Sequence, residues 1–192
     1  LDLLPGPRDR QGLPDRIRFW KSQIEEPNAD RTFRVGLLYG PSGCGKSSLV
    51  KAGLLPRLSK RIDPIYVEAT ADDTEARLLR QLRRHGGPRQ STSSLAQAVS
   101  LIRRGRSISS DKVILVIDQF EQWLHANPLS PDLELVNALR QCDGGRIQCI
   151  LMVRDDHFWM PVTRLLKLLE VSLDANNSSA IDLFDASHAR KV

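Results

Sequence analysis

The sequence predicts an α/β protein with a three-layer α/β/α core built around a largely parallel five-stranded sheet. Short apolar segments alternate with segments of helical periodicity along the 192 residues, as in sheets built from strand-helix-strand units. Residues 112–118 are apolar without alternation, which is typical of a strand covered on both faces. Crossovers between such strands are right-handed, and ligands bind where the strands' carboxyl ends meet.

The composition indicates one globular domain. Hydrophobic residues make up 41% of the chain and charged residues 27%, the balance of a soluble protein. The longest apolar runs, 113–117 and 149–153, are far shorter than the roughly 18 residues of a membrane span, so we expect no membrane association. Three cysteines without a CxxC pair indicate free thiols and a cytoplasmic location. The first residue, Leu1, indicates a piece of a longer protein.

The first elements divide the chain into residues 1–32, an irregular lead-in with an N-terminal helix, and residues 33–192, the core. The helix is predicted over 15–25, where apolar residues recur at spacings of three and four. Residues 33–40 form a short apolar run that ends in glycine and predicts a buried strand. A helix is expected over 46–58, broken near its proline.

The middle of the chain continues the alternation. A strand is predicted over 64–69, and Asp72 with Glu75 three residues later resembles a capping box at the start of the next helix. A further helix is predicted over 94–104, ended by a glycine, and the apolar strand 112–118 follows.

The last third supplies the remaining elements. Ser130 and Pro131 are predicted to open a helix, and a strand is expected over 146–154. A helix is then expected over 161–169, and a weaker apolar segment, 180–184, is the candidate for the fifth strand.

The sequence GPSGCGKSS, at positions 40–48, matches G-x-x-x-x-G-K-[ST] between a predicted strand and a predicted helix. Its glycines allow positive φ and close backbone approach, so that successive N–H groups can surround phosphates at the helix's positive end. Lys46 can reach the β- and γ-phosphates and Ser47 can bind magnesium, so ATP or ADP with Mg²⁺ is the expected ligand. No N-K-x-D sequence occurs, which favours adenine over guanine. The expected nucleotide-binding residues are Gly40, Pro41, Ser42, Gly43, Cys44, Gly45, Lys46, Ser47 and Ser48.

A carboxylate follows the apolar strand at 112–118. Asp118 is in the position from which an aspartate holds a nucleotide's magnesium, although a helix N-cap would also suit it. The next residue, Gln119, lies where many ATPases carry a glutamate, and glutamine can orient a water but cannot take its proton. Glu121 is the nearby carboxylate that a turn or new helix can return to the site; it is either the water activator or a solvated first-turn glutamate.

Arg154 ends the strand at 146–154, on the same edge of the sheet as the glycine-rich loop. A guanidinium there can touch the γ-phosphate and distinguish ATP from ADP; the alternative is an ordinary ion pair with Asp155 or Asp156. The predicted catalytic residues are Lys46, Asp118, Glu121 and Arg154, and the predicted magnesium ligands are Ser47 and Asp118.

Arginine dominates a positive net charge of +5 and is clustered at 77–89 and 102–106. Such clusters can bind nucleic-acid phosphates, but solvated helix ends have the same composition. No aromatic residues are interleaved with these arginines to stack on bases, which favours the solvated surface.

Four motifs together resemble the STAND class of signalling P-loop NTPases, relatives of NACHT, NB-ARC and AAA+ ATPases, and most of all the bacterial novel STAND group. They are the glycine-rich loop, SSLVKAGLLPRL at 47–58, DQFE at 118–121 and RDDHF at 154–158, so the resemblance spans residues 33–158. The loop alone is shared by many NTPases, whereas the combination is more specific.

The resemblance implies that Asp118 is the Walker B aspartate, Glu121 the second acidic position and Arg154 the sensor arginine. Members often carry two consecutive acids after the aromatic residue, whereas here Gln122 follows Glu121, which argues against fast hydrolysis. The resemblance implies an ATP-binding, slowly hydrolysing switch within a larger signalling protein. Its partners would be other domains of the same polypeptide, such as a protein kinase or WD repeats, and further copies in nucleotide-dependent self-association.

Two alternatives to the switch remain. The first is an AAA+-like ATPase that acts with nucleic acid through its arginine-rich surface. The second, a phosphoryl-transfer kinase for a small acceptor, is weaker because the sequence shows no acceptor-binding segment.

Overall fold

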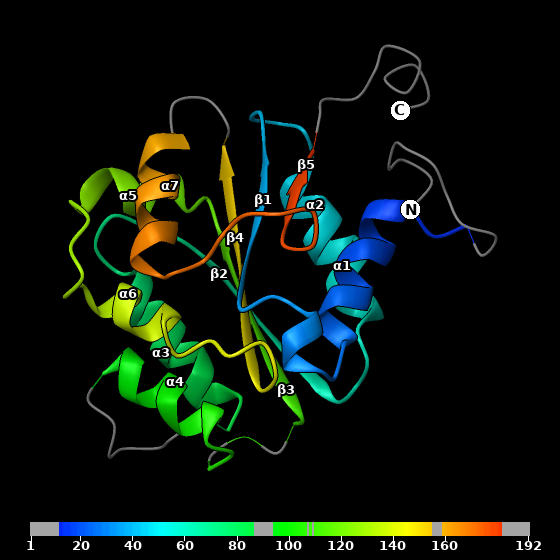
Figure 1. The fold of residues 1–192 in the computed structure, drawn as a ribbon, viewed down its shortest axis with the longest axis horizontal. Coiled ribbons are helices and arrows are strands. Elements are labelled where there is room, and N and C mark those ends of the chain that lie inside the picture. The colour runs from blue at the N-terminus through cyan, green and yellow to red at the C-terminus, as the bar shows by residue number, and fades with distance from the viewer. Residues whose placement is uncertain (1–11, 87–93, 107, 109, 155–158, 182–192) are drawn as a thin grey trace.

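The computed structural model describes residues 12–86, 94–106, 108, 110–154 and 159–181. Its centre is a five-stranded parallel sheet in the order β2-β3-β4-β1-β5 (Figure 1). This confirms the predicted α/β class and the parallel sheet. The strands are β1 (Val35–Gly40), β2 (Ile62–Glu68), β3 (Lys112–Asp118), β4 (Ile147–Arg154) and β5 (Ser178–Ala180).

Helices cover both faces of the sheet because its central strands are apolar on both sides. In β3, Ile114 and Val116 pack toward one face, while Leu115 and Ile117 pack toward the other. The first face carries α1 (Asp15–Glu25), α2 (Lys46–Ser48) and η2 (Leu49–Leu54). The second face carries α3 (Thr74–Arg84), α4 (Leu95–Arg103), α5 (Glu121–Ala126), α6 (Glu134–Leu139) and α7 (Trp159–Leu168). Two short 3₁₀ segments, η1 (Ala29–Arg31) and η3 (Leu55–Arg57), complete the described elements.

The strand register brings the predicted site residues to one edge. Gly40 at the end of β1 is the register partner of Arg154 at the end of β4. In the same way Glu68 at the end of β2 is paired with Asp118 at the end of β3. The carboxyl ends of four neighbouring strands therefore stop at nearly the same level, which is where parallel sheets of this kind bind ligands.

The N-terminal helix α1 packs against the sheet and belongs to the same folded unit. Trp20 is fully buried and lies edge-on to Phe33, with ring centroids 5.4 Å apart. A Cβ at Gly36 would lie 2.8 Å from the Trp20 ring, so β1 needs glycine there. On β3, the buried Lys112 ammonium donates to the backbone carbonyls of Ile24 and Glu26, at 2.9 and 2.8 Å, and so holds the carboxyl end of α1 against the sheet.

The segment after the glycine-rich loop differs from the single helix predicted over 46–58. It changes from α-helical (α2) to π-helical (η2), where the Leu55 N–H bonds to the Val50 carbonyl five residues earlier. It then ends in η3, which contains Pro56. Proline has no N–H to continue an α-helical ladder, which explains the break at the predicted place.

Three local predictions were wrong. The capping box before α3 does not form: the helix starts at Thr74, no side chain caps it, and Glu75 instead accepts a hydrogen bond from Trp123 Nε1 at 2.9 Å. Helix α6 begins at Glu134, several residues after Pro131. The fifth strand is Ser178–Ala180 rather than 180–184, and the end of the predicted strand, beyond position 181, lies outside the described residues.

All three cysteines are free thiols, as the sequence predicted, and all three are buried. Burial raises the pKa of the Cys142 thiol to about 12 and raises that of Cys149 well above its ordinary value, so both stay protonated and behave as apolar core residues. Within the part of the chain that the structure describes, no helix combines the length and the apolar character needed to cross a membrane.

Candidate nucleotide-binding site

The glycine-rich loop between β1 and α2 owes its shape to glycine. Gly43 and Gly45 have φ of 79° and 87°, in the left-handed region that other residues rarely adopt. At Gly40 the reason is space, because a Cβ there would lie 2.0 Å from the carbonyl oxygen of Ile181. The chain therefore turns tightly from the strand into the helix, whose first bond runs from Leu49 N–H to the Gly45 carbonyl at 2.8 Å.

Lys46 opens the helix and returns its side chain over the loop. Its ammonium donates to the carbonyl oxygens of Gly40 and Pro41, at 2.7 and 2.9 Å, and lies 3.6 Å from Cys44 Sγ. Cys44 itself is a buried residue that packs in the core. Cys44, one of the nucleotide-binding residues expected from the sequence, can therefore contribute only its backbone to a ligand.

Asp118, at the end of β3, faces the beginning of α2. Ser47 Oγ donates to Asp118 Oδ2 at 2.5 Å, and the Gln119 backbone N–H donates to Asp118 Oδ1 at 2.7 Å. Asp118 as a residue is only 2% exposed, so these bonds largely replace water in orienting its carboxylate. The two residues predicted from sequence as magnesium ligands are thus brought together from positions 71 residues apart.

Tyr66 on β2 is a third residue that contacts this carboxylate, and it was not predicted from the sequence. Its hydroxyl donates to Asp118 Oδ2, the oxygen that Ser47 also uses. Burial raises the pKa of Tyr66 well above its ordinary value, and the hydrogen bond to Asp118 raises it further. The hydroxyl therefore stays a donor at all physiological pH values. A tyrosine on a predicted strand carries no sequence signal of this role, since it depends on β2 lying beside β3.

A strained turn follows Asp118 and determines the direction of the residues that come after it. Gln119 has φ of 52°, unusual for a residue with a side chain. The turn sends Phe120 inward, where its N–H bonds to the Met152 carbonyl at 2.9 Å. The Phe120 ring stacks on Trp123 with centroids 5.4 Å apart, and both side chains are fully buried. These anchors fix the start of α5, and with it the position of Glu121.

Glu121, at the start of α5, and Arg154, at the end of β4, contact each other. Glu121 Oε2 accepts a hydrogen bond from the Arg154 backbone N–H at 3.3 Å, and the Glu121 side chain is 6% exposed. Glu121 is therefore a nearly buried carboxylate, and the alternative of a solvated first-turn glutamate is wrong. Asp155 and Asp156, the alternative ion-pair partners of Arg154, lie outside the described residues.

These side chains surround one cavity of about 500 Å³. Of the residues predicted from sequence, Gly40, Pro41 and Cys44 support the loop without lining this cavity. Gln119 and Gln122 line it in addition. The lining residues are Ser42, Gly43, Gly45, Lys46, Ser47, Ser48, Asp118, Gln119, Glu121, Gln122 and Arg154.

The donor set fits a phosphate-bound magnesium ion. Magnesium takes hard oxygen ligands and is commonly held by one or two protein oxygens together with phosphate and water. Ser47 Oγ and Asp118 Oδ2 are two such oxygens, and Lys46 and Arg154 supply positive charge on the same cavity. The arrangement can thus hold an anionic ligand and its cation together.

Comparison with protein families agrees with this geometry. The sequence profile of the family described as Novel STAND NTPase 1 matches residues 17–184, which include every residue that lines the cavity. The chain belongs to this family. The novel STAND NTPase domain thus extends from α1 through β5, and the resemblance expected from the loop, DQFE and RDDHF motifs is confirmed.

Solved structures share the fold of this novel STAND NTPase domain. The ADP form of the Aeropyrum pernix ORC2 protein is 16% identical with a TM-score of 0.64, and the match covers 97% of this chain and 52% of that one. A Walker-type ATPase of Pyrococcus abyssi is 15% identical with a TM-score of 0.61, covering 100% of this chain and 60% of that one. Drosophila ORC bound to DNA is 14% identical with a TM-score of 0.59, and the match covers 92% of this chain and 44% of that one.

At such identities the likeness shows the fold alone, a P-loop NTPase domain. The novel STAND NTPase domain spans between about two fifths and three fifths of the length of these chains. Comparison with curated protein sequences gives no match.

Proposed function

We propose that this domain is an ATP-binding, slowly hydrolysing switch of a larger signalling protein. The observation that carries the proposal is the single cavity that collects the glycine-rich loop, Asp118, Glu121 and Arg154. In a switch of this kind, contacts to the γ-phosphate and its magnesium bias a conformational equilibrium. Other domains of the same polypeptide, or further copies of it, would receive the signal.

Each residue has a defined task in this proposal. The loop N–H groups and Lys46 bind the phosphates, as glycine-rich loops before helices do. Ser47 and Asp118 hold the magnesium ion, which neutralises phosphate charge when bound. Arg154 stands at the β4 end that shares its register with Gly40, where a guanidinium can distinguish ATP from ADP.

Slow turnover follows from the residues beside Asp118. Gln119 and Gln122 line the cavity but are amides, which cannot accept a proton from water. Glu121 is the carboxylate of this turn that faces the cavity beside Asp118, and its Oε2 is already bonded to the Arg154 N–H. A single, partly engaged base suits a switch that must remain in its ATP state for some time.

The test is Glu121→Gln, with Glu170→Gln, an exposed glutamate outside the cavity, as the matched control. We expect unchanged affinity for magnesium-ATP by calorimetry and a single-turnover hydrolysis rate lowered by about 100-fold or more, the range of a lost general base. Gln122→Glu should raise the rate. Hydrolysis by Glu121→Gln at the wild-type rate would exclude Glu121 as the base, and a wild-type domain that binds no ATP would contradict the switch itself.

A second candidate function is an ATPase that acts with DNA. The arginine-rich helix α3 motivates it, and one protein of similar fold, Drosophila ORC, was solved bound to DNA. A steep fall of duplex affinity with salt would favour this function. Affinity no higher than that of a neutral control protein would remove it.

A further inference from the structure

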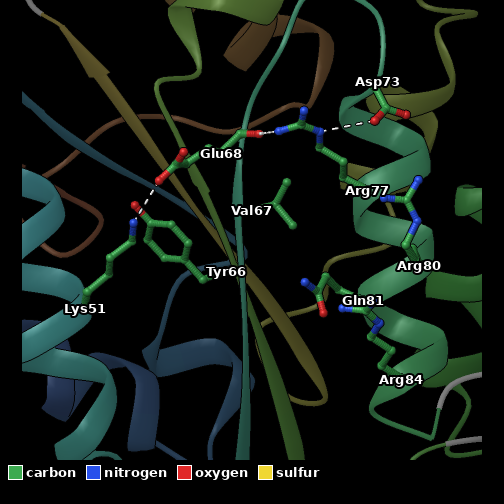
Figure 2. A pocket seen from close by; sticks show the side chains of 9 residues that line it. All are labelled: Lys51, Tyr66, Val67, Glu68, Asp73, Arg77, Arg80, Gln81 and Arg84. Carbon is green, nitrogen blue, oxygen red and sulfur yellow. Dashed lines mark hydrogen bonds and ion pairs between the residues drawn. The ribbon is translucent and has the colours of Figure 1, made fainter.

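A second cavity, of about 410 Å³, lies along the outer edge of β2 and shares no lining residue with the nucleotide cavity. Figure 2 shows its walls: η2 on one side, the end of β2 in the middle and α3 on the other side. We call it the β2-edge groove. Its charged lining residues are Lys51, Glu68, Asp73, Arg77, Arg80 and Arg84.

Positive charge exceeds negative charge in the β2-edge groove. Its two carboxylates are already engaged: Glu68 pairs with Lys51 at 2.8 Å, and Asp73 pairs with Arg77 at 3.2 Å. Arg80 and Arg84 are exposed, and among the described residues neither guanidinium makes an ion pair or a hydrogen bond. Two guanidinium groups on one helix face thus remain available to an anionic ligand.

The strand in the middle of the groove offers backbone groups as well. Among the strands that the structure describes, β2 lies at the edge of the sheet and is bonded to β3 alone. The Lys112 N–H donates to Arg61 O and the Ala69 N–H donates to Asp118 O, so odd-numbered residues of this segment face β3. Since successive residues alternate, the N–H and C=O of Tyr66 point outward along the edge. Such groups pair readily with an added extended chain.

The spacing of the arginines suits an extended chain. Arg80 and Arg84 are four residues apart on α3, a rise of about 6 Å. Alternate side chains of an extended peptide are separated by about 6.6 Å, because each residue advances about 3.3 Å. Carboxylates at positions i and i+2 of such a peptide would therefore face the two guanidinium groups in turn.

We propose that the β2-edge groove binds an acidic peptide segment in extended conformation. The segment pairs with the outward backbone of Tyr66 and places alternate carboxylates on Arg80 and Arg84. Pro64, which has no N–H, limits this pairing to the carboxyl-terminal part of β2 and protects the rest of the edge. A nucleic acid is the less suitable ligand, because the Tyr66 ring, the aromatic group of the groove, already lies under the Lys51 ammonium at 4.4 Å.

The probe is a fluorescein-labelled, capped peptide of about eight residues in which glutamate and threonine alternate, titrated with the domain by fluorescence anisotropy. We expect saturable binding that weakens with salt, and a loss of affinity of about tenfold or more in Arg80→Glu/Arg84→Glu. The matched control is Arg104→Glu/Arg106→Glu. It makes the same change in net charge at exposed arginines outside the groove and should bind nearly as wild type does.

Two further ligands test whether binding depends on the spacing of the carboxylates, on total charge or on the class of ligand. A peptide with the same composition but four glutamates followed by four threonines should bind more weakly than the alternating one. A single-stranded oligonucleotide of equal charge should bind more weakly than either peptide. The proposal is overturned if the charge-reversal variant and its control bind alike, if no peptide binds, or if the oligonucleotide binds more tightly. Circular dichroism of each variant shows that any loss is not unfolding.

Discussion

Replacing Tyr66 by phenylalanine removes one hydroxyl and leaves the ring, with its contact to Lys51, in place. The hydroxyl donates to the carboxylate of Asp118, a buried residue, so water cannot readily take its place there. Hydrogen bonds to charged groups contribute about 1.5–3 kcal/mol, and we expect a loss of about 2 kcal/mol because Ser47 and the Gln119 N–H still donate. For a domain of this size that lowers the Tm by about 4–8 °C.

The assay is urea unfolding at several pH values, with Tyr39→Phe, which removes the chain's other tyrosine hydroxyl, as control. Because the pKa of Tyr66 is higher folded than unfolded, the unfolded chain loses this proton first as pH rises above about 10. The free energy of unfolding of the wild type therefore falls above this pH, and the difference in stability between the wild type and Tyr66→Phe becomes smaller. Equal stability of the two proteins at neutral pH, or an advantage that grows with alkaline pH, would refute the hydrogen bond to Asp118.

Two more substitutions test contacts that support the structure around the site. Gly40→Ala should destabilise the fold by more than about 3 kcal/mol or prevent folding, since its Cβ would lie 2.0 Å from the Ile181 carbonyl; soluble protein with wild-type Tm would contradict this contact. Lys112→Met should cost about 1–3 kcal/mol in denaturant unfolding, because it leaves the carbonyls of Ile24 and Glu26 without their buried donor. An unchanged midpoint would mean that α1 is held by its apolar contacts alone.

Much of the fold could be predicted because its signals are local. The apolar run of β3 and the glycine-rich loop identify themselves in sequence, and the parallel order then aligns strand ends without further information. Asp118, Glu121 and Arg154 could be predicted for the same reason, since each directly follows or ends an apolar strand or begins the next helix. Their positions depend on where strands end and helices begin, and these boundaries are marked by local sequence patterns.

What could not be predicted depends on contacts between distant segments. Tyr66 acquires its role only because β2 pairs with β3, and nothing around it in sequence differs from an ordinary strand tyrosine. Glu75 has the spacing of a capping box but bonds to Trp123, 48 residues away, so a tertiary contact replaces a local one. The burial of Cys44 likewise follows from packing beneath the loop.

We propose above all that the loop before α2 binds the phosphates of ATP with magnesium. Calorimetric titration of the wild type and of Lys46→Ala with magnesium-ATP tests it most directly, with Lys60→Ala, an exposed lysine outside the cavity, as control. We predict saturable binding for the wild type and Lys60→Ala and none for Lys46→Ala. Unchanged binding by Lys46→Ala would contradict the assignment of this loop and of the nucleotide site built on it.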